Sequence, residues 1–139
     1  YLLFLSDSTQ PLRNDWLDEM LGYAVQPGVG VVGAKAVGTD GNVSNAGYVL
    51  GLGGQPAGLH DLHVPLDDPG YFGRLQVPGN PSAVSATCLL TEKKLFDELG
   101  GFDEHLLAAG YSDVDYCLKV GKANQRVVWT PFALMFQPH

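Results

Sequence analysis

Short apolar segments alternate with amphipathic segments along this chain, and this alternation restricts the fold more than any other feature. Helices are predicted after Asn14, after Thr91 and from Ser112, because apolar residues there recur at helical spacing. Buried strands are predicted by four runs rich in aliphatic and β-branched residues, at 1–5, 29–33, 83–90 and 126–129. Strands that alternate with helices in this way are typical of a layered α/β fold.

The middle of the chain departs from this alternation. Asp40-Gly41 is a turn signal between two apolar segments, which indicates antiparallel pairing and therefore a mixed sheet. Residues 45–50 again have the pattern of a strand. The stretch 51–80 is rich in glycine and proline and has little periodicity. A loop of this length inside a compact domain is usually functional or disordered.

Length and composition bound the class of protein. The chain has 139 residues, of which 45% are hydrophobic and 17% charged, so a single soluble domain, 1–139, is expected. Its net charge of −7 and its lack of a Lys/Arg cluster argue against a nucleic acid as partner. No apolar run approaches the roughly 20 residues of a membrane span. Cys88 and Cys117 lie in apolar patterns and are predicted to be buried reduced thiols, with a disulfide as the alternative.

Two acidic residues, Asp113 and Asp115, mark the point where a polar loop becomes a helix. One interpretation is capping, since Ser112 and Asp115 have the spacing of a capping box and Asp113 suits the positive end of the helix dipole. The other interpretation makes Asp113 a general base that takes a proton from a substrate hydroxyl. The two are compatible, because Asp115 can cap the helix while Asp113 reacts.

The segment Ser6-Asp7-Ser8 directly follows the first predicted strand. Open α/β sheets bind ligands just outside the carboxyl ends of their strands. Asp7 is therefore a candidate ligand for Mg²⁺ or Mn²⁺, together with phosphate oxygens of a bound cofactor or substrate. The alternative is an ordinary Asx-type turn. His139, the last residue of the chain, is a second candidate metal ligand.

Three groups of motifs follow one another along nearly the whole chain. They are Leu2-Leu-Phe-Leu-Ser-Asp-Ser-Thr9 with Asp15-Trp-Leu17; Asp68-Pro-Gly-Tyr-Phe-Gly73 with Ser82-Ala-Val-Ser-Ala-Thr-Cys-Leu-Leu90 and Phe96-Asp-Glu-Leu-Gly-Gly-Phe-Asp-Glu104; and Ser112-Asp-Val-Asp-Tyr-Cys-Leu118 with Arg126-Val-Val-Trp-Thr-Pro131. Together they resemble GT-A glycosyltransferases of family 2. The first group is similar to the family's strand, acidic loop and helix, the second to its acceptor-side region, and the third to its catalytic helix and closing strand.

The resemblance implies a partial GT-A fold, the nucleotide-diphospho-sugar transferase type, whose N-terminal nucleotide-binding half is missing. We therefore expect a fragment of a larger glycosyltransferase domain, and the apolar pattern that begins at Tyr1 favours the same interpretation. It implies transfer of a sugar from a nucleotide-sugar donor to a glycan or lipid-linked acceptor, with inversion. Polysaccharide or cell-surface glycan synthesis in the cytoplasm, at the inner face of the membrane, is the expected setting.

The resemblance also assigns roles to individual residues. Asp113 matches the position of the family's base, and Ser6, Asp7 and Ser8 match the loop that binds the cofactor cation, Mg²⁺ or Mn²⁺. The family's loop is D-x-D or N-[ND]-D, so Ser8 stands here at the last acidic position. This departure leaves two hypotheses open: an inverting glycosyltransferase fragment that is inactive alone, and a non-catalytic carbohydrate-binding or interaction module with the same fold.

Overall fold

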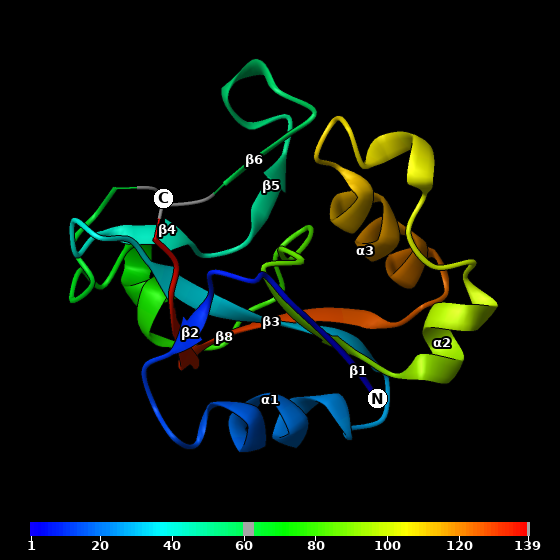
Figure 1. Cartoon of the computed structure of the whole chain (residues 1–139), viewed down its shortest axis with the longest axis horizontal. Coiled ribbons are helices and arrows are strands. Elements are labelled where there is room, and N and C mark those ends of the chain that lie inside the picture. The colour runs from blue at the N-terminus through cyan, green and yellow to red at the C-terminus, as the bar shows by residue number, and fades with distance from the viewer. Residues whose placement is uncertain (60–62, 139) are drawn as a thin grey trace.

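The computed structural model describes residues 1–59 and 63–138 and contains a mixed α/β arrangement (Figure 1). In chain order its elements are β1 (Leu2–Leu5), β2 (Gln10–Pro11), α1 (Trp16–Ala24), β3 (Val29–Val37), β4 (Val43–Asn45), β5 (Tyr48–Leu50), η1 (Leu52–Gly54), β6 (Ala57–Leu59), η2 (Tyr71–Gln76), β7 (Cys88–Thr91), α2 (Lys93–Glu98), η3 (Glu104–Leu106), α3 (Ser112–Lys122) and β8 (Arg126–Phe136). Among these residues, no helix is long and apolar enough to cross a membrane.

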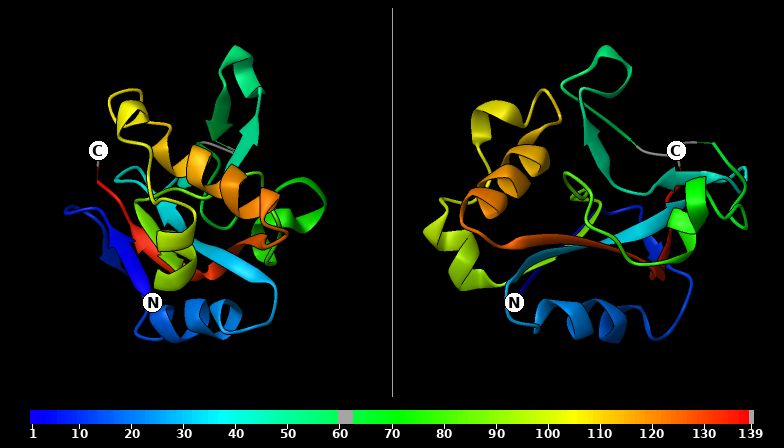
Figure 2. Two further views of the ribbon diagram at one scale, coloured as in Figure 1. Left: turned by 90° about the vertical axis from the view of Figure 1, so that its right-hand side faces the viewer. Right: turned by 180° about the vertical axis from the view of Figure 1, so that it is seen from behind.

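The main sheet has the strand order β1-β7-β3-β8-β2, and β4 pairs with β3 in addition. The long strands β3 and β8 are parallel, whereas β7 is antiparallel to both of its neighbours, β1 and β3. The predicted mixed sheet is thus confirmed. Helix α1 covers one face of this sheet, and α2 and α3 lie on the other side (Figure 2).

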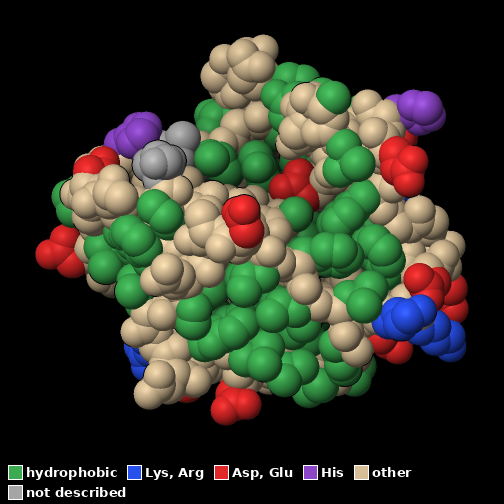
Figure 3. All heavy atoms as spheres, in the orientation of Figure 1, with side chains coloured by type: hydrophobic (Ala, Val, Ile, Leu, Met, Phe, Trp, Pro, Cys, Tyr) green, Lys and Arg blue, Asp and Glu red, His purple; other side chains and the backbone are tan. Residues whose placement is uncertain are grey.

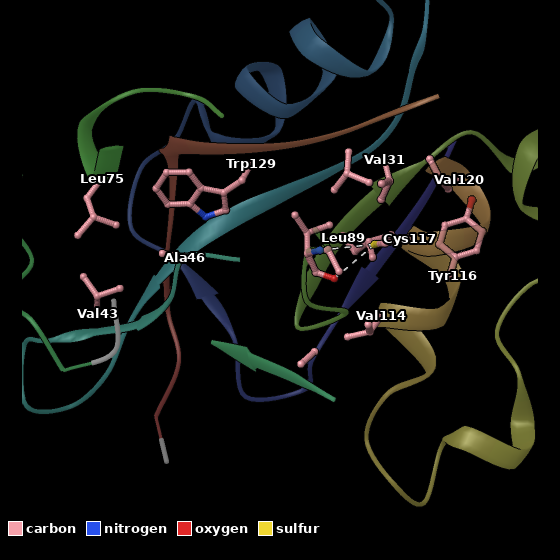
Figure 4. Close-up of a cluster of buried hydrophobic side chains, with 14 residues drawn as sticks. Val31, Val43, Ala46, Leu75, Leu89, Val114, Tyr116, Cys117, Val120 and Trp129 are labelled. Carbon is pink, nitrogen blue, oxygen red and sulfur yellow. Dashed lines mark hydrogen bonds between the residues drawn. The ribbon is translucent and has the colours of Figure 1, made fainter. Parts of the chain in front are cut away.

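Two hydrophobic clusters fill the spaces on either side of the sheet. Met20 of α1 packs with Val32, Leu90 and Met135 in one cluster. In the other, Trp129 of β8 lies with Val31 and Leu89 of the sheet and with Val114, Tyr116, Cys117 and Val120 of α3 (Figure 4). Both cysteines are buried and free, as predicted.

Strand β1 is not the buried strand that its apolar run predicts. It lies at the edge of the main sheet and, within the described residues, pairs with β7 alone. Phe4 points into the cluster around Phe96 and Phe102, but Leu3 and Leu5 remain 36% and 42% exposed on the other face. Hydrophobic side chains gather on the face of the molecule that carries β1 (Figure 3).

The stretch 51–80, predicted as one long loop, contains several short elements in its described part. Strand β6 pairs with β5, which directly precedes the stretch, and the two form a hairpin that projects from the main sheet (Figure 1). The later part of the stretch is held by Lys35, a buried residue of β3. Its Nζ donates hydrogen bonds to the backbone oxygens of Leu66, at 3.2 Å, and Leu75, at 3.3 Å. Burial lowers the pKa of Lys35, while the charge of Asp68 opposes that shift.

Candidate active site

Asp113 is buried at the start of α3 and faces a turn of the chain that precedes β7. Its Oδ2 accepts a hydrogen bond from the backbone N–H of Ala86 at 2.9 Å, and its Oδ1 accepts one from Val114 at 2.8 Å. The side chain is thus held in one orientation by two backbone donors. Only 6% of Asp113 is exposed, so a proton acceptor is positioned in a mostly desolvated place.

A second contact between α3 and the same turn supports this arrangement. The Sγ of Cys117, one helical turn after Asp113, lies 3.5 Å from the backbone nitrogen of Val84 and 3.8 Å from its oxygen. Burial raises the pKa of Cys117 to about 12, so the thiol stays protonated at neutral pH. Cys117 thus contacts Val84, two residues before the amide of Ala86 that binds Asp113.

Burial also raises the pKa of Asp113 above its ordinary value, while the hydrogen bonds from Ala86 and Val114 oppose the shift. A carboxylate with a raised pKa is a stronger base than one in water, and a base is most effective when its pKa approaches the working pH. The environment of Asp113 therefore favours the role of a general base.

The predicted capping box at this helix is wrong. The N-terminal cap position of α3 is Tyr111, which makes no side-chain cap hydrogen bond, and Ser112 is the first residue of the helix itself. The carboxylate of Asp115 lies 3.1 Å from the Nζ of Lys119, an ion-pair contact one turn further along the helix. Because the chain enters the helix one residue earlier than assumed, Ser112 and Asp115 do not have the capping relationship.

This geometry makes Asp115→Asn a mild substitution. The lost contact is an i, i+4 ion pair on a partly exposed helix face, and such pairs contribute about 0.3–0.5 kcal/mol. We expect the free energy of unfolding, measured by urea denaturation, to fall by no more than about 0.5 kcal/mol. A loss near 2 kcal/mol would mean that Asp115 stabilises the start of α3 after all.

Tyr48, which the sequence did not single out, lies near Asp113. Burial, and secondly the charge of Asp113, raise the pKa of Tyr48 to about 12, although a side-chain hydrogen bond with Ser85 opposes the shift. The phenol is therefore a permanent hydrogen-bond donor at neutral pH. No local pattern marks this residue, because Tyr48 and Asp113 are far apart in the sequence and the fold brings them near each other, where Tyr48 pairs with Ala83.

The acidic loop after β1 adjoins the same turn. The backbone N–H of Ser6 donates a hydrogen bond to the oxygen of Thr87 at 3.0 Å, one residue from the amide that binds Asp113. A backbone bond from Thr9 to Ser6 closes the loop as a tight turn, and the hydroxyl oxygens of Ser6 and Ser8 lie 3.4 Å apart. Asp7 is exposed at this turn. The two sequence-predicted segments, 6–8 and 112–115, thus contact adjacent residues of one turn, Thr87 and Ala86.

The predicted metal site has few candidate ligands among the described residues. In the ranges 1–59 and 63–138, no three His, Cys, Asp or Glu side chains come together in a way that could hold an ion. His139 lies outside the described residues. Asp7 with two neighbouring serines is not a complete cation site, because Mg²⁺ and Mn²⁺ need several oxygen ligands, so further oxygens would have to come from a bound diphosphate.

Comparison with known proteins gives three informative similarities, and no family model matches the chain. The uncharacterized protein y4gI of Sinorhizobium fredii is 45% identical over 132 residues, which cover 95% of this chain and 14% of that protein. The O-antigen biosynthesis protein RfbC of Myxococcus xanthus is 36% identical over 132 residues, 93% of this chain and 10% of its own length. The pre-mycofactocin glycosyltransferase of Mycobacterium tuberculosis is 27% identical over 144 aligned positions, 100% of this chain and 27% of that protein.

These similarities extend over most of the chain. They support a relationship to glycosyltransferases that are similar to family 2, as the motifs predict. It spans only a small part of these relatives, between 10% and 27% of their length.

Proposed function

We propose that this chain is the acceptor-side, catalytic part of an inverting glycosyltransferase that acts within a longer protein. The observation that carries the proposal is the buried carboxylate of Asp113, held by the amide of Ala86 beside the acidic loop at Asp7. The donor would be a nucleotide-sugar and the acceptor a glycan or a lipid-linked saccharide. The similarity to an O-antigen biosynthesis protein supports polysaccharide or cell-surface glycan synthesis, and the similarity to a pre-mycofactocin glycosyltransferase supports glycosyl transfer. A cytoplasmic location, at the inner face of the membrane, is part of the proposal.

In the proposed reaction Asp113 removes the proton of the acceptor hydroxyl as that oxygen attacks the anomeric carbon. The new carbon–oxygen bond forms while the bond from the sugar to the diphosphate breaks, and its electron pair leaves on the diphosphate. The proton ends on the Asp113 carboxylate. A single displacement of this kind inverts the anomeric carbon. Tyr48, protonated at neutral pH, stays a hydrogen-bond donor and does not compete with Asp113 as a base.

A divalent cation, Mg²⁺ or Mn²⁺, would neutralise charge on the leaving diphosphate, and Asp7 would be its ligand from the described part of this chain. Because Asp7 is exposed and has only serines beside it, we expect weak Mn²⁺ binding by the isolated chain, with a dissociation constant above about 1 mM. Titration calorimetry with wild type and Asp7→Ala measures it. Low-micromolar binding that disappears in Asp7→Ala would contradict this expectation.

Activity assays on two forms of the protein test the proposed function. A full-length parent that carries this segment is expected to transfer sugar from one member of a panel of UDP-, GDP- and dTDP-sugars. The isolated 139-residue chain is expected to show no turnover, because it spans a small part of its relatives and leaves Leu3 and Leu5 of its edge strand uncovered. Saturable, donor-specific hydrolysis by the isolated chain would overturn the second expectation.

A non-catalytic carbohydrate-binding module is the second candidate, favoured by the single carboxylate in the loop at Asp7. The same panel separates the two functions. A parent that binds a glycan but transfers no sugar from any donor would favour the binding module, whereas transfer by the parent would exclude it.

A further inference from the structure

Three hollows adjoin one another along the segment 77–82, and Asn80 lines all of them. Their volumes are about 320, 690 and 150 Å³. The first is bounded by Val49 of β5, the second by the last turns of α3, and the third by Tyr23 near the end of α1. Because they share Asn80 and its neighbours, the three hollows form one furrow around the segment 77–82.

The charged side chains that line this furrow are all positive. Arg74 lines the first hollow, Lys122 the second, and Arg126 both the second and the third. No described Asp or Glu lines any of them, although the chain has 15 acidic residues and a net charge of −7. Within the described part of the chain Lys122 and Arg126 form no ion pair, whereas Arg13 and Lys94, two exposed cations elsewhere, each contact a carboxylate. The furrow is therefore a positively charged region on an acidic protein.

Helix α3 explains only part of this charge. Lys122 lies in the last turn of α3, where a cation is favourable beside the negative end of the helix dipole. Arg126 begins β8, after the helix has ended, and Arg74 lies in η2, so the dipole of α3 explains neither. Cations that come from three separate segments, with no carboxylate among them, are an arrangement that attracts and binds anions.

Uncharged polar side chains also line the furrow, and they suit a ligand with hydroxyl groups. Asn80, Ser82 and Gln125 line the second hollow, and Gln26 lines the third. The Nδ2 of Asn80 donates a hydrogen bond to the backbone oxygen of Val127 at 2.7 Å, which orients the amide. Amide side chains both donate and accept hydrogen bonds, as sugar hydroxyls do. The cations and amides together match a saccharide that carries anionic groups.

An acidic peptide is a poorer match for this furrow. Extended peptides are typically bound by pairing with a free strand edge, with pockets for their alternate side chains. Here the backbone N–H and C=O of Gly79 are both hydrogen-bonded to Trp129, at 2.9 Å each. The segment 77–82 thus offers no free strand edge at this point.

We propose that the furrow binds an anionic glycan, a saccharide chain that carries carboxylate or phosphate groups. Lys122 follows Asp113 by nine residues in α3, which corresponds to about 14 Å along the helix axis. A sugar chain whose hydroxyl meets Asp113 would reach the furrow only through further sugar residues, so the acceptor would be an acidic oligosaccharide or polysaccharide. The choice of a glycan rests on the proposed function, but binding can be measured without any transfer reaction.

Calorimetry on a full-length parent, without donor, tests the proposal with trigalacturonate, a mannose trimer joined by phosphodiesters, and neutral maltotriose. At least one anionic probe is expected to bind about tenfold more tightly than maltotriose at low ionic strength, and the tighter of the two identifies the anionic group. This preference should shrink between about 0.01 M and about 0.15 M salt, because the Debye length falls from about 30 Å to about 8 Å. Equal affinity for all three probes, or no binding, would overturn the proposal.

A matched pair of double variants assigns this binding to the furrow. Lys122→Gln with Arg126→Gln removes two cations of the furrow, and Lys94→Gln with Arg13→Gln removes the same charge outside it. All four residues are exposed, so both variants are expected to fold. The first should lose most of the preference for the anionic probe, about tenfold, and the second should keep it. Wild-type binding by the first variant would overturn the inference.

Triglutamate separates a glycan from a peptide as the ligand. It carries carboxylates but no hydroxyls, so it is expected to bind more weakly than the anionic saccharides. Tighter binding of triglutamate, with the same dependence on Lys122 and Arg126, would make the furrow a site for an acidic peptide and would overturn the inference.

The two proposals fail in different measurements. If the parent transfers sugar and depends on Asp113, but the double variant at Lys122 and Arg126 binds the anionic probe as wild type does, only the anionic subsite is wrong. If binding of the anionic probe depends on Lys122 and Arg126 but no donor is turned over by the parent, the furrow is a glycan site and the transferase function is wrong.

Discussion

Asp113→Asn is expected to lower the rate of sugar transfer by a full-length parent by about 10²–10⁴-fold, the usual contribution of a general base. Asparagine has nearly the same shape and can still accept a hydrogen bond from the amide of Ala86, but it cannot take a proton from the acceptor. Donor binding should change little, because the role proposed for Asp113 is to take the proton of the acceptor hydroxyl. The measurement is kcat with saturating donor and acceptor. A variant with near-wild-type kcat would leave Asp113 as a helix-start residue only.

The raised pKa of Asp113 determines how the stability of wild type, compared with that of Asp113→Asn, changes with pH. A folded-state pKa above the ordinary value of 3.8 means that the contribution of the protonated group to stability is fully present below about pH 3.8 and is lost as the pH rises through the raised value. Asn carries no charge at any pH. The free energy of unfolding of wild type, relative to that of Asp113→Asn, should therefore fall as the pH rises through this window. At neutral pH we expect the variant to be within about 1 kcal/mol of wild type. Urea denaturation at several pH values checks both statements.

Gly33→Ala is expected to destabilise the fold by about 3 kcal/mol. Gly33 lies in the middle of β3, where a Cβ atom would be 2.3 Å from the Cβ of Val84 and 2.6 Å from its Cγ1. Valine is rigid at χ1 and Val84 is 1% exposed, so the strand or the segment 84–86 would have to move. Since Ala86 holds Asp113, transfer by the parent should fall as well.

Gly22→Ala is the matched control for this substitution. Gly22 lies in helix α1, and a Cβ there would meet no atom within 4 Å. Because alanine loses less chain entropy than glycine in a helix, we expect a gain of about 0.5–1 kcal/mol. Should Gly33→Ala unfold at the same urea concentration as wild type, the close approach of β3 to Val84 would not exist in solution.

Periodic patterns predicted the elements with the longest regular sequence, and they were least accurate next to the candidate site. The run 83–90 has the composition of one strand, yet β7 begins only at Cys88. The residues before it form a bridge at Ala83 and a turn held by Ser85, whose hydroxyl accepts from the backbone N–H of Thr87. Composition alone could not show this, because the turn is set by the contacts with α3 and β5.

Two other errors have equally specific causes. The last strand was expected to end at 129, before Pro131, but β8 continues to Phe136. A register shift against β3, between Ala34 and Lys35, takes the proline out of the ladder, and pairing resumes at Leu134. At β1 the apolar run predicts a buried strand, although an edge strand with one exposed apolar face has the same composition.

The candidate site could be predicted only as separate pieces. Asp7 and Asp113 stand out locally, one after a strand and one at a helix start. That both lie near the same turn could not be predicted. It depends on the backbone groups of Thr87 and Ala86, which any sequence would supply. Tyr48 was missed for the same reason, since its position near Asp113 follows from the tertiary fold.

The configuration of the product tests the account most directly. A full-length parent is incubated with its α-linked nucleotide-sugar donor, and the anomeric proton of the first product formed is followed by NMR. A single displacement assisted by Asp113 predicts a β-linked product from the first turnover onward. A product that keeps the α configuration would contradict the account, because retention does not proceed by one attack of a base-activated hydroxyl on the anomeric carbon.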